Sequence, residues 1–259
     1  MDLEFLVRFS LSLMSDTFND KQSSASNMKI SDEEIRRMVE AFDLMQTSVA
    51  NDFRKKYSAK IKEIEGKRVL FVGDSLTFDR IGYRGIVSKA GRLKAKNAAQ
   101  SGATSTEMYR FIYENIYTHK PEIISVMIGT NDAFGHCGLE KNRLVSLSEY
   151  RRNIKGIIEN CVKSGAKTLV FTIPPMDENA FRQTKDALFK ENDNKNIAKY
   201  NKVVREEVAL SGAQLIDLET ALKSYSNEGI YHSDGVHLSF LGQKILADLW
   251  LENVLGKEV

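Results

Sequence analysis

The 259-residue chain has little of what marks the more specialised classes of protein. Its two cysteines, Cys137 and Cys161, are too few for a disulfide framework and do not have the CxxC spacing of a metal site. The 37 basic and 35 acidic side chains give a net charge of only +2. Because neither sign dominates, the charge balance does not favour nucleic acid or an anionic membrane as a partner. We therefore predict no nucleic-acid partner.

Long hydrophobic runs are also missing. The sequence has no stretch of about 18 uncharged apolar residues, the length that a membrane-spanning helix needs, so we predict no stable membrane insertion. Residues 1–14 are apolar but include Asp2, Glu4 and Arg8. A secretory signal begins with a basic region and ends in a small-residue cleavage site, whereas this segment begins with an acidic residue. We predict that the segment is retained and that the protein is cytoplasmic.

From residue 67 onward, strand patterns alternate with helix patterns. Strands are predicted near residues 67–72, 92–96, 122–129, 167–173 and 213–218. Helices are predicted near residues 78–90, 104–118, 147–164, 195–211 and 239–254. Five strands that alternate with helices imply a parallel sheet covered on both faces. Right-handed crossovers then give a flavodoxin-like three-layer α/β/α sandwich.

Two helical segments precede this region. Residues 3–18 carry apolar side chains at helical spacing. Ser31 and Glu34 form a capping box before a long amphipathic helix, predicted over residues 32–65. Its apolar stripe must be covered by the same chain or by a partner. We therefore predict an N-terminal helical extension, 1–66, and a homodimer to which it contributes. The alternative, contact of the first helix with a membrane surface, lacks the usual lysine- and arginine-rich face.

A serine follows the first predicted strand at a position that suits catalysis. The segment Gly73-Asp74-Ser75-Leu76-Thr77 comes directly after an apolar β-branched run. This pattern indicates a tight turn that presents Ser75 at the carboxyl end of the sheet, although a helix N-cap is the simpler structural role for a serine. A nucleophilic serine needs a base and a third group that orients the base. Asp234 and His237, three residues apart, supply both. We predict Ser75 as the nucleophile, His237 as the base and Asp234 as the orienting acid.

The other histidines carry weaker signals. His119 stands between a predicted helix and a predicted strand, which favours a structural role. His136 and Cys137 are neighbours, but no second pair at ligand spacing accompanies them. His232 lies close to the acid–histidine pair and is a candidate to line the site. We predict no metal ion and no organic cofactor.

Four short blocks of this sequence, in this order, resemble those of the SGNH hydrolases, the GDSL family of esterases and lipases. The blocks are residues 73–77, 97–102, 128–132 and 233–237. The resemblance spans roughly residues 67–254 and implies a hydrolase domain, 67–259. It also implies a serine esterase that works through an acyl-enzyme intermediate, although some members of the family manage with a serine–histidine pair.

The resemblance further implies three donors to a developing oxyanion. They are the backbone amides of Ser75 and Gly102 and the side-chain amide of Asn131. Taken singly, Gly102 also suits a turn that needs positive φ, and Asn131 also suits an Asx turn. We expect Asp74 and Asp132 to bind nearby backbone and hold their turns.

The resemblance implies a carboxylic ester as the substrate, and the loops give a first indication of its size. The segments near 78–85, 133–146 and 174–196 contain no long apolar wall for a fatty chain, and we expect the last of them to cover part of the site. A short acyl group, such as O-acetyl on carbohydrate, is therefore favoured. The alternatives are a lysophospholipase- or thioesterase-type acyl hydrolase and a non-catalytic binding module on the same scaffold.

Overall fold

The structure is a computed structural model, and it describes residues 3–9, 31–135, 143–184, 192–225 and 229–256. The strands are β1 (Arg68–Gly73), β2 (Lys94–Asn97), β3 (Ile123–Met127), β4 (Lys167–Phe171) and β5 (Gln214–Ile216). The helices before β3 are α1 (Leu3–Phe9), α3 (Asp32–Lys56), the 3-10 helix η1 (Ile61–Glu63), α4 (Ser75–Phe78), α5 (Tyr83–Ala90) and α6 (Ser105–His119). Those after β3 are α7 (Thr130–Ala133), α8 (Leu147–Lys163), α9 (Glu178–Thr184), α10 (Asn194–Ala209), α11 (Leu218–Leu222) and α12 (Phe240–Leu255).

The five strands form one parallel sheet in the order β2-β1-β3-β4-β5. This is the flavodoxin-like order, so the predicted fold class is confirmed. The strand order reverses between β1 and β3, and in open α/β sheets ligands bind outside the carboxyl ends of the strands at such a point. Gly73 and Met127 are paired across these two strands at their carboxyl ends. The fold thus places the residues that follow β1 and β3 next to each other.

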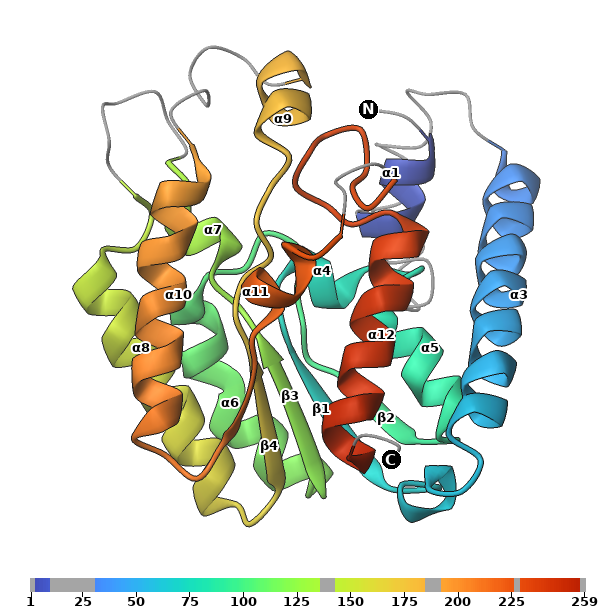
Figure 1. Cartoon of the computed structure of the whole chain (residues 1–259), viewed down its shortest axis with the longest axis horizontal. Helices are drawn as coiled ribbons and strands as arrows, with labels where there is room; N and C mark the ends of the chain where they lie inside the picture. Colours follow the sequence, from blue (N-terminus) through green and yellow to red (C-terminus); the bar gives the residue numbers. More distant parts are fainter. Residues whose placement is uncertain (1–2, 10–30, 136–142, 185–191, 226–228, 257–259) are drawn as a thin grey trace.

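Two layers of helices cover the sheet. One hydrophobic cluster joins the sheet to α3, α5 and α12, and a second joins the opposite face to α6, α8 and α10. Figure 1 shows these groups on the two sides of the strands, with the short helices α4 and α7 at one end of the sheet. Strands β1 and β3 are buried along almost their whole length. They are therefore rich in apolar side chains on both faces, as strands of a parallel sheet usually are.

The long N-terminal helix is shorter than its periodicity predicts. Its start is the predicted capping box, in which Ser31 and Glu34 satisfy each other's backbone amides. Its end is at Lys56, not near residue 65. Tyr57 and Ile61 are buried, and the chain turns beneath the core through η1 before it enters β1. The apolar positions beyond Lys56 keep a helical spacing because they fill the core in this turn.

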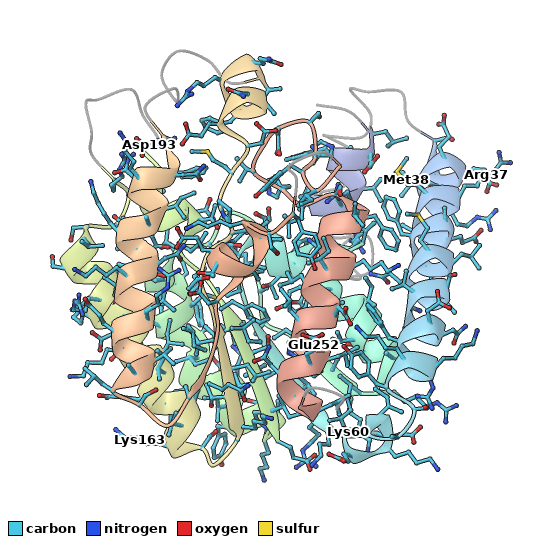
Figure 2. The ribbon with its side chains drawn as sticks, viewed as in Figure 1. Arg37, Met38, Lys60, Lys163, Asp193 and Glu252 are labelled. Carbon is cyan, nitrogen blue, oxygen red and sulfur yellow. The ribbon has the colours of Figure 1, made fainter. Side chains whose placement is uncertain are left out.

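The apolar stripe of α3 is covered by the same chain. Val49, Ala50 and Phe53 are buried in the cluster that also contains residues of α5 and α12. At the other end of the helix, Met38 lies on the side facing α1, whereas Arg37 extends outward (Figure 2). Along this part of α3, the stripe is therefore covered without a second copy. The homodimer itself, and the division into segments 1–66 and 67–259, stay predictions.

A second difference concerns the region predicted as one helix over residues 78–90. The chain forms two helices, α4 and α5, which residues 79–82 separate. The Asp79 carboxylate accepts a hydrogen bond from the amide of Ile81 at 3.1 Å. Such a local bond competes with helical hydrogen bonding and breaks the helix here.

Within the residues that the structure describes, no helix is long and apolar enough to cross a membrane. The alternative of a membrane-surface helix concerns the apolar residues near the N-terminus, namely Phe5, Leu6, Phe9 and Leu13. Leu6 and Phe9 are buried against the rest of the chain, so they do not face a lipid surface in this structure. Leu13 lies outside the described residues.

Candidate active site

Ser75 stands in the tight turn between β1 and α4. The turn requires glycine at position 73, because a Cβ atom there would lie 2.3 Å from the carbonyl oxygen of Met127. The N-cap of α4 is Asp74, which accepts a hydrogen bond from the amide of Leu76 at 3.1 Å. The simpler role considered for Ser75, an N-cap, therefore belongs to its neighbour. This leaves the Ser75 hydroxyl free to bond elsewhere.

Asp234 and His237 share one tight turn before α12. Oxygen Oδ1 of Asp234 accepts hydrogen bonds from the amides of Val236 and His237, both at 3.0 Å. The turn is closed by the amide of His232, which donates to the carbonyl of His237 at 2.8 Å. These backbone bonds fix the acid relative to the imidazole.

A continuous chain of hydrogen bonds connects the three predicted residues. His237 Nδ1 lies 2.6 Å from Asp234 Oδ2, and His237 Nε2 lies 2.8 Å from Ser75 Oγ. Because a carboxylate can only accept, we assign the hydrogen on Nδ1, which leaves Nε2 to accept the Ser75 proton. Serine and histidine come from positions 162 residues apart in the chain. This is the arrangement in which a serine hydroxyl can act as a nucleophile.

Asp234, the acid of this hydrogen-bonded series, is held ionised. Burial alone would raise the pKa of Asp234, but the hydrogen bond from His237, its electrostatic attraction and the two backbone amides outweigh it. The pKa of Asp234 consequently lies well below its ordinary value. The carboxylate therefore stays negative across the neutral and mildly acidic range, where it can stabilise an imidazolium.

The second and third sequence blocks lie next to Ser75. The amide of Gln100 donates to the carbonyl of Gly73 at 3.1 Å, which places the second block beside the turn that carries Ser75. Gly102 has φ of +79°, a conformation that favours glycine. The side-chain amide of Asn131 donates to the carbonyl of Ala103 at 2.9 Å. The structure thus brings Gly102 and Asn131 together on adjoining loops, and one hydrogen of the Asn131 amide is already used to orient it.

Asp132 does more than the sequence suggests. Its carboxylate accepts from the amide of Ser105 at 2.9 Å and from the Ser105 hydroxyl, so it caps α6 across 27 residues. This long-range bond adds to the local role expected for Asp132, because Ser105 lies beyond the second block, at the start of α6. Burial raises the pKa of Asp132 to about 6, and burial likewise raises that of Asp74 to about 6. These two carboxyls hold the loops of the site rather than the imidazole.

The raised pKa of Asp132 predicts a pH-dependent stability. A carboxyl with a higher pKa in the folded state binds more protons there, so its contribution to the free energy of unfolding increases as the pH falls through 6. From pH 7 to 5.5 the expected gain is about 1 kcal/mol. The variant Asp132→Asn keeps an oxygen for Ser105. Urea unfolding of this variant at the two pH values should not show this gain in the free energy of unfolding. Equal pH profiles for wild type and variant would contradict the assignment.

The two acids near the site should also differ in their effect on activity. Asp234 contacts the imidazole directly, whereas Asp132 contacts Ser105. We expect Asp234→Ala to lose more activity than Asp132→Ala in steady-state hydrolysis of a simple ester. The loss from Asp234 should be smaller than that from Ser75 or His237, as is known for the acid of serine–histidine–aspartate triads. The reverse ranking would mean that Asp132, not Asp234, is the acid.

The remaining histidines and cysteines add no catalytic group among the described residues. His232 lies beside the pair, with Nδ1 3.8 Å from Asp234 Oδ1. Cys161 is buried, and burial raises the pKa of its thiol to about 12. Within the described ranges, no cluster of three or more histidine, cysteine, aspartate or glutamate side chains could hold a metal ion. His136 and Cys137 fall outside those ranges.

The N-terminal helix α1 also contributes to this site, which the sequence did not predict. The rings of Phe5 and Phe9, both on α1, lie with centroids 5.3 Å and 4.2 Å from that of His237. The sequence does indicate that the two phenylalanines act together, since they are four residues apart and share one helix face. Nothing in the sequence, however, indicates that this face meets a loop more than 200 residues away.

The segment 174–196, which we expected to cover part of the site, contributes Asp177. Its amide donates to the carbonyl of Gly235 at 2.8 Å.

Comparisons with known proteins identify the family of this chain. A model of the GDSL-like lipase/acylhydrolase family matches residues 71–245. The acetylxylan esterase of Geobacillus stearothermophilus is 24% identical over 219 residues, which cover 73% of this chain and 94% of that protein.

Solved structures give the same result for the fold. A lipase/acylhydrolase from Enterococcus faecalis superposes with a TM-score of 0.60 at 21% identity, covering 74% of this chain and 100% of that one. The acetylxylan esterase Axe2 from Geobacillus stearothermophilus gives a TM-score of 0.59 at 22% identity, covering 76% of this chain and 97% of the other. Because the family match includes more than half of the sequence, this chain belongs to the GDSL-like lipase/acylhydrolase family, and its prediction as a serine ester hydrolase of that family is confirmed.

Proposed function

We propose that Ser75, His237 and Asp234 form the catalytic triad of a serine esterase that hydrolyses short-chain carboxylic esters. The observation that carries the proposal is the hydrogen-bonded chain from Ser75 Oγ through the imidazole to the Asp234 carboxylate, with links of 2.8 Å and 2.6 Å. A serine hydroxyl bonded to a neutral imidazole nitrogen can lose its proton as it attacks. A structural serine would not need this partner.

The reaction proceeds in two steps, acylation of Ser75 and hydrolysis of the acyl-enzyme. Ser75 Oγ attacks the ester carbonyl while its proton passes to His237 Nε2, and the imidazolium then protonates the departing alcohol. Water attacks the resulting acyl-enzyme, gives its proton to Nε2, and releases the carboxylic acid as the Ser75 hydroxyl is restored. Asp234 keeps the imidazole oriented and stabilises its charged form in both halves.

Three donors stabilise the tetrahedral intermediates in this proposal. They are the backbone amides of Ser75 and Gly102 and the second hydrogen of the Asn131 side-chain amide. The bond from Asn131 to the Ala103 carbonyl supports the assignment, because it fixes the amide plane beside the second block. Donors that are already oriented cost no reorganisation when the charge develops, and each is worth a few kcal/mol in other enzymes.

The substrate we propose is an O-acetyl or similarly short ester on carbohydrate. The relatives named above as acetylxylan esterases support this substrate class. A further solved relative is a catalytic mutant of Axe2 in which a serine is replaced by alanine, which supports the serine chemistry. Within this chain, the buried Phe9 beside His237 limits the space next to the base and is consistent with a small acyl group.

A hydrolysis panel tests the substrate class. p-Nitrophenyl esters of two to twelve carbons would be compared with acetylated xylo-oligosaccharides, a lysophospholipid and an acyl thioester. We expect kcat/KM to fall with chain length beyond about four carbons and acetate to be released from the sugars. Activity that increases toward twelve carbons, or that is confined to the lysophospholipid or thioester, would favour the acyl-hydrolase alternative instead.

The remaining parts of the proposal concern the setting of the enzyme. We propose a cytoplasmic protein whose residues 1–66 extend a hydrolase domain of residues 67–259, with a homodimer formed through the N-terminal helices. The exposed Leu44 and Met45 on α3 are the described residues that a second copy could cover. Light scattering of the full chain, compared with the variant in which both are replaced by serine, tests the dimer.

A further inference from the structure

The first helix, α1, contacts the candidate active site although it lies far outside the family match, which begins at residue 71. Figure 1 shows α1 beside α4 and the loop that leads into α12. On its other side, Leu6 and Val7 pack in a small hydrophobic cluster with Ile35 of α3. The helix is therefore held between α3 and the two segments that carry Ser75 and His237.

Arg8 makes the central contact of this helix, and it is 1% exposed. Its guanidinium donates to both carboxylate oxygens of Asp79, at 3.2 Å to Oδ1 and 2.7 Å to Oδ2. The same guanidinium donates to the carbonyl oxygen of Leu238 at 2.6 Å. Such a planar fork of donors fixes direction as well as distance.

The two partners of Arg8 flank the catalytic pair. The amide of Asp79 donates to the carbonyl of Ser75 at 2.9 Å, so Asp79 closes the turn that carries the serine. Leu238 directly follows His237 in the chain. One guanidinium therefore connects the segment of the nucleophile with the segment of the base. The bond between Ser75 and His237 and the bonds of Gln243 also join these segments.

Phe9 adds a contact with the base itself. Its ring lies 4.2 Å, centroid to centroid, from the imidazole of His237 at an interplanar angle of 36°, and Phe9 is 3% exposed. The carboxylate of Asp234 holds the imidazole through Nδ1, while Phe9 limits its rotation from the side. The base is thus oriented by one group from its own turn and one from α1.

We propose that α1 is part of the catalytic apparatus, with Arg8 as a positioning residue that sets the distance between Ser75 and His237 and Phe9 as a support for the imidazole. This inference depends on the proposed function, because it requires Ser75 and His237 to react. A displacement of about 1 Å between reacting groups can cost about 100-fold in rate, so a residue that acts only through position can have a large effect.

The test separates positioning from simple structural support. Arg8→Met leaves the Asp79 charge buried without its partner, and this lowers stability as well as disturbing the site. The double variant Arg8→Met/Asp79→Asn removes both charges and should recover thermal stability, since Asp79 also has Gln243 Nε2 at 3.1 Å as a donor that an amide oxygen can still use. We expect kcat for p-nitrophenyl acetate to stay 10- to 100-fold below wild type in both variants, with KM changed less than about threefold.

The control is Glu4→Gln, which changes the exposed partner of Arg8 at 3.2 Å and should keep kcat within twofold of wild type. Phe9→Ala should lower kcat about 10-fold, with rescue by Phe9→Tyr or Phe9→Leu in proportion to the restored contact. If kcat recovers together with the melting temperature in the double variant, Arg8 is merely structural and the inference is wrong. An increase of kcat on loss of Arg8 would also overturn it, because α1 would then be an inhibitory cover.

Labelling of Ser75 by a fluorophosphonate distinguishes this inference from the proposed function. If wild type labels at Ser75 and Arg8→Met/Asp79→Asn labels at least 10-fold more slowly, both hold. If wild type labels and the double variant labels equally fast, the proposed function stands and the role of Arg8 is refuted. Absence of labelling in wild type would refute the proposed function, and with it the inference.

Discussion

Ser75→Ala is expected to lower kcat/KM for a short-chain ester by roughly 10⁵- to 10⁶-fold, the scale of nucleophile loss in other serine hydrolases. The reason is that no described oxygen or sulfur nucleophile other than Ser75 Oγ is bonded to His237 Nε2. The variant should fold normally, because the turn around Ser75 is held by Gly73 and Asp74 rather than by the hydroxyl. Initial rates at substrate concentrations well below KM, with a thermal melt alongside, measure both effects.

Thr77 provides a matched control for this variant. It lies two residues further along α4, is buried, and also carries a hydroxyl, which lies 3.4 Å from that of Tyr83. Thr77→Val should change kcat/KM by less than about 10-fold, since it removes one buried hydrogen bond and no proton-transfer step. Retention of more than a tenth of wild-type activity in Ser75→Ala would exclude Ser75 as the nucleophile.

His237→Asn should cause a loss of similar size, because asparagine has no nitrogen able to accept the serine proton. The double variant Ser75→Ala/His237→Asn should be no less active than either single variant, since residues that act in one step are strongly non-additive. His232→Asn is the control, as His232 lies on the same turn but bonds to the backbone of His237 through its amide. We expect less than a 10-fold loss from that change.

The same step makes activity depend on pH. At mildly acidic pH, an imidazole that has become protonated cannot take the proton of serine. Asp234 has a lowered pKa and stays ionised through this range, so it does not cause the loss. Activity should therefore fall on acidification, while the contribution of Asp132 to the free energy of unfolding increases.

A His232 variant that loses as much activity as the His237 variant would mean that the base is misassigned.

The sheet and the catalytic segments could be predicted from the sequence because their signals are local. Strands β1, β3 and β4 are short apolar runs, whereas the edge strand β2 is polar and is indicated by its place between two helices. Alternation and right-handed crossovers restrict the sheet to a few doubly wound orders, of which β2-β1-β3-β4-β5 is one. Ser75, Asp234 and His237 sit in short motifs whose spacing itself sets the geometry. The bond of Asp234 to the amide of His237, three residues on, is an example of such a local rule.

Other features depend on contacts between distant parts of the chain. The end of α3 at Lys56 follows from the burial of Tyr57 and Ile61 beneath the sheet, and periodicity cannot distinguish this from a longer helix. Asp132 binds Ser105 across 27 residues, and Arg8 binds Asp79 across 71. No local pattern specifies such partners, because a buried charge can pair with any opposite charge that the fold brings near.

Incubation with a fluorophosphonate probe followed by peptide mass spectrometry tests most directly whether a serine at residue 75 and an imidazole at residue 237 form one reactive unit. The expected result is a single adduct on Ser75, absent in Ser75→Ala and slowed at least 100-fold in His237→Asn. An intact, folded protein that forms no adduct, or forms one at another serine, would contradict it and favour the non-catalytic binding module.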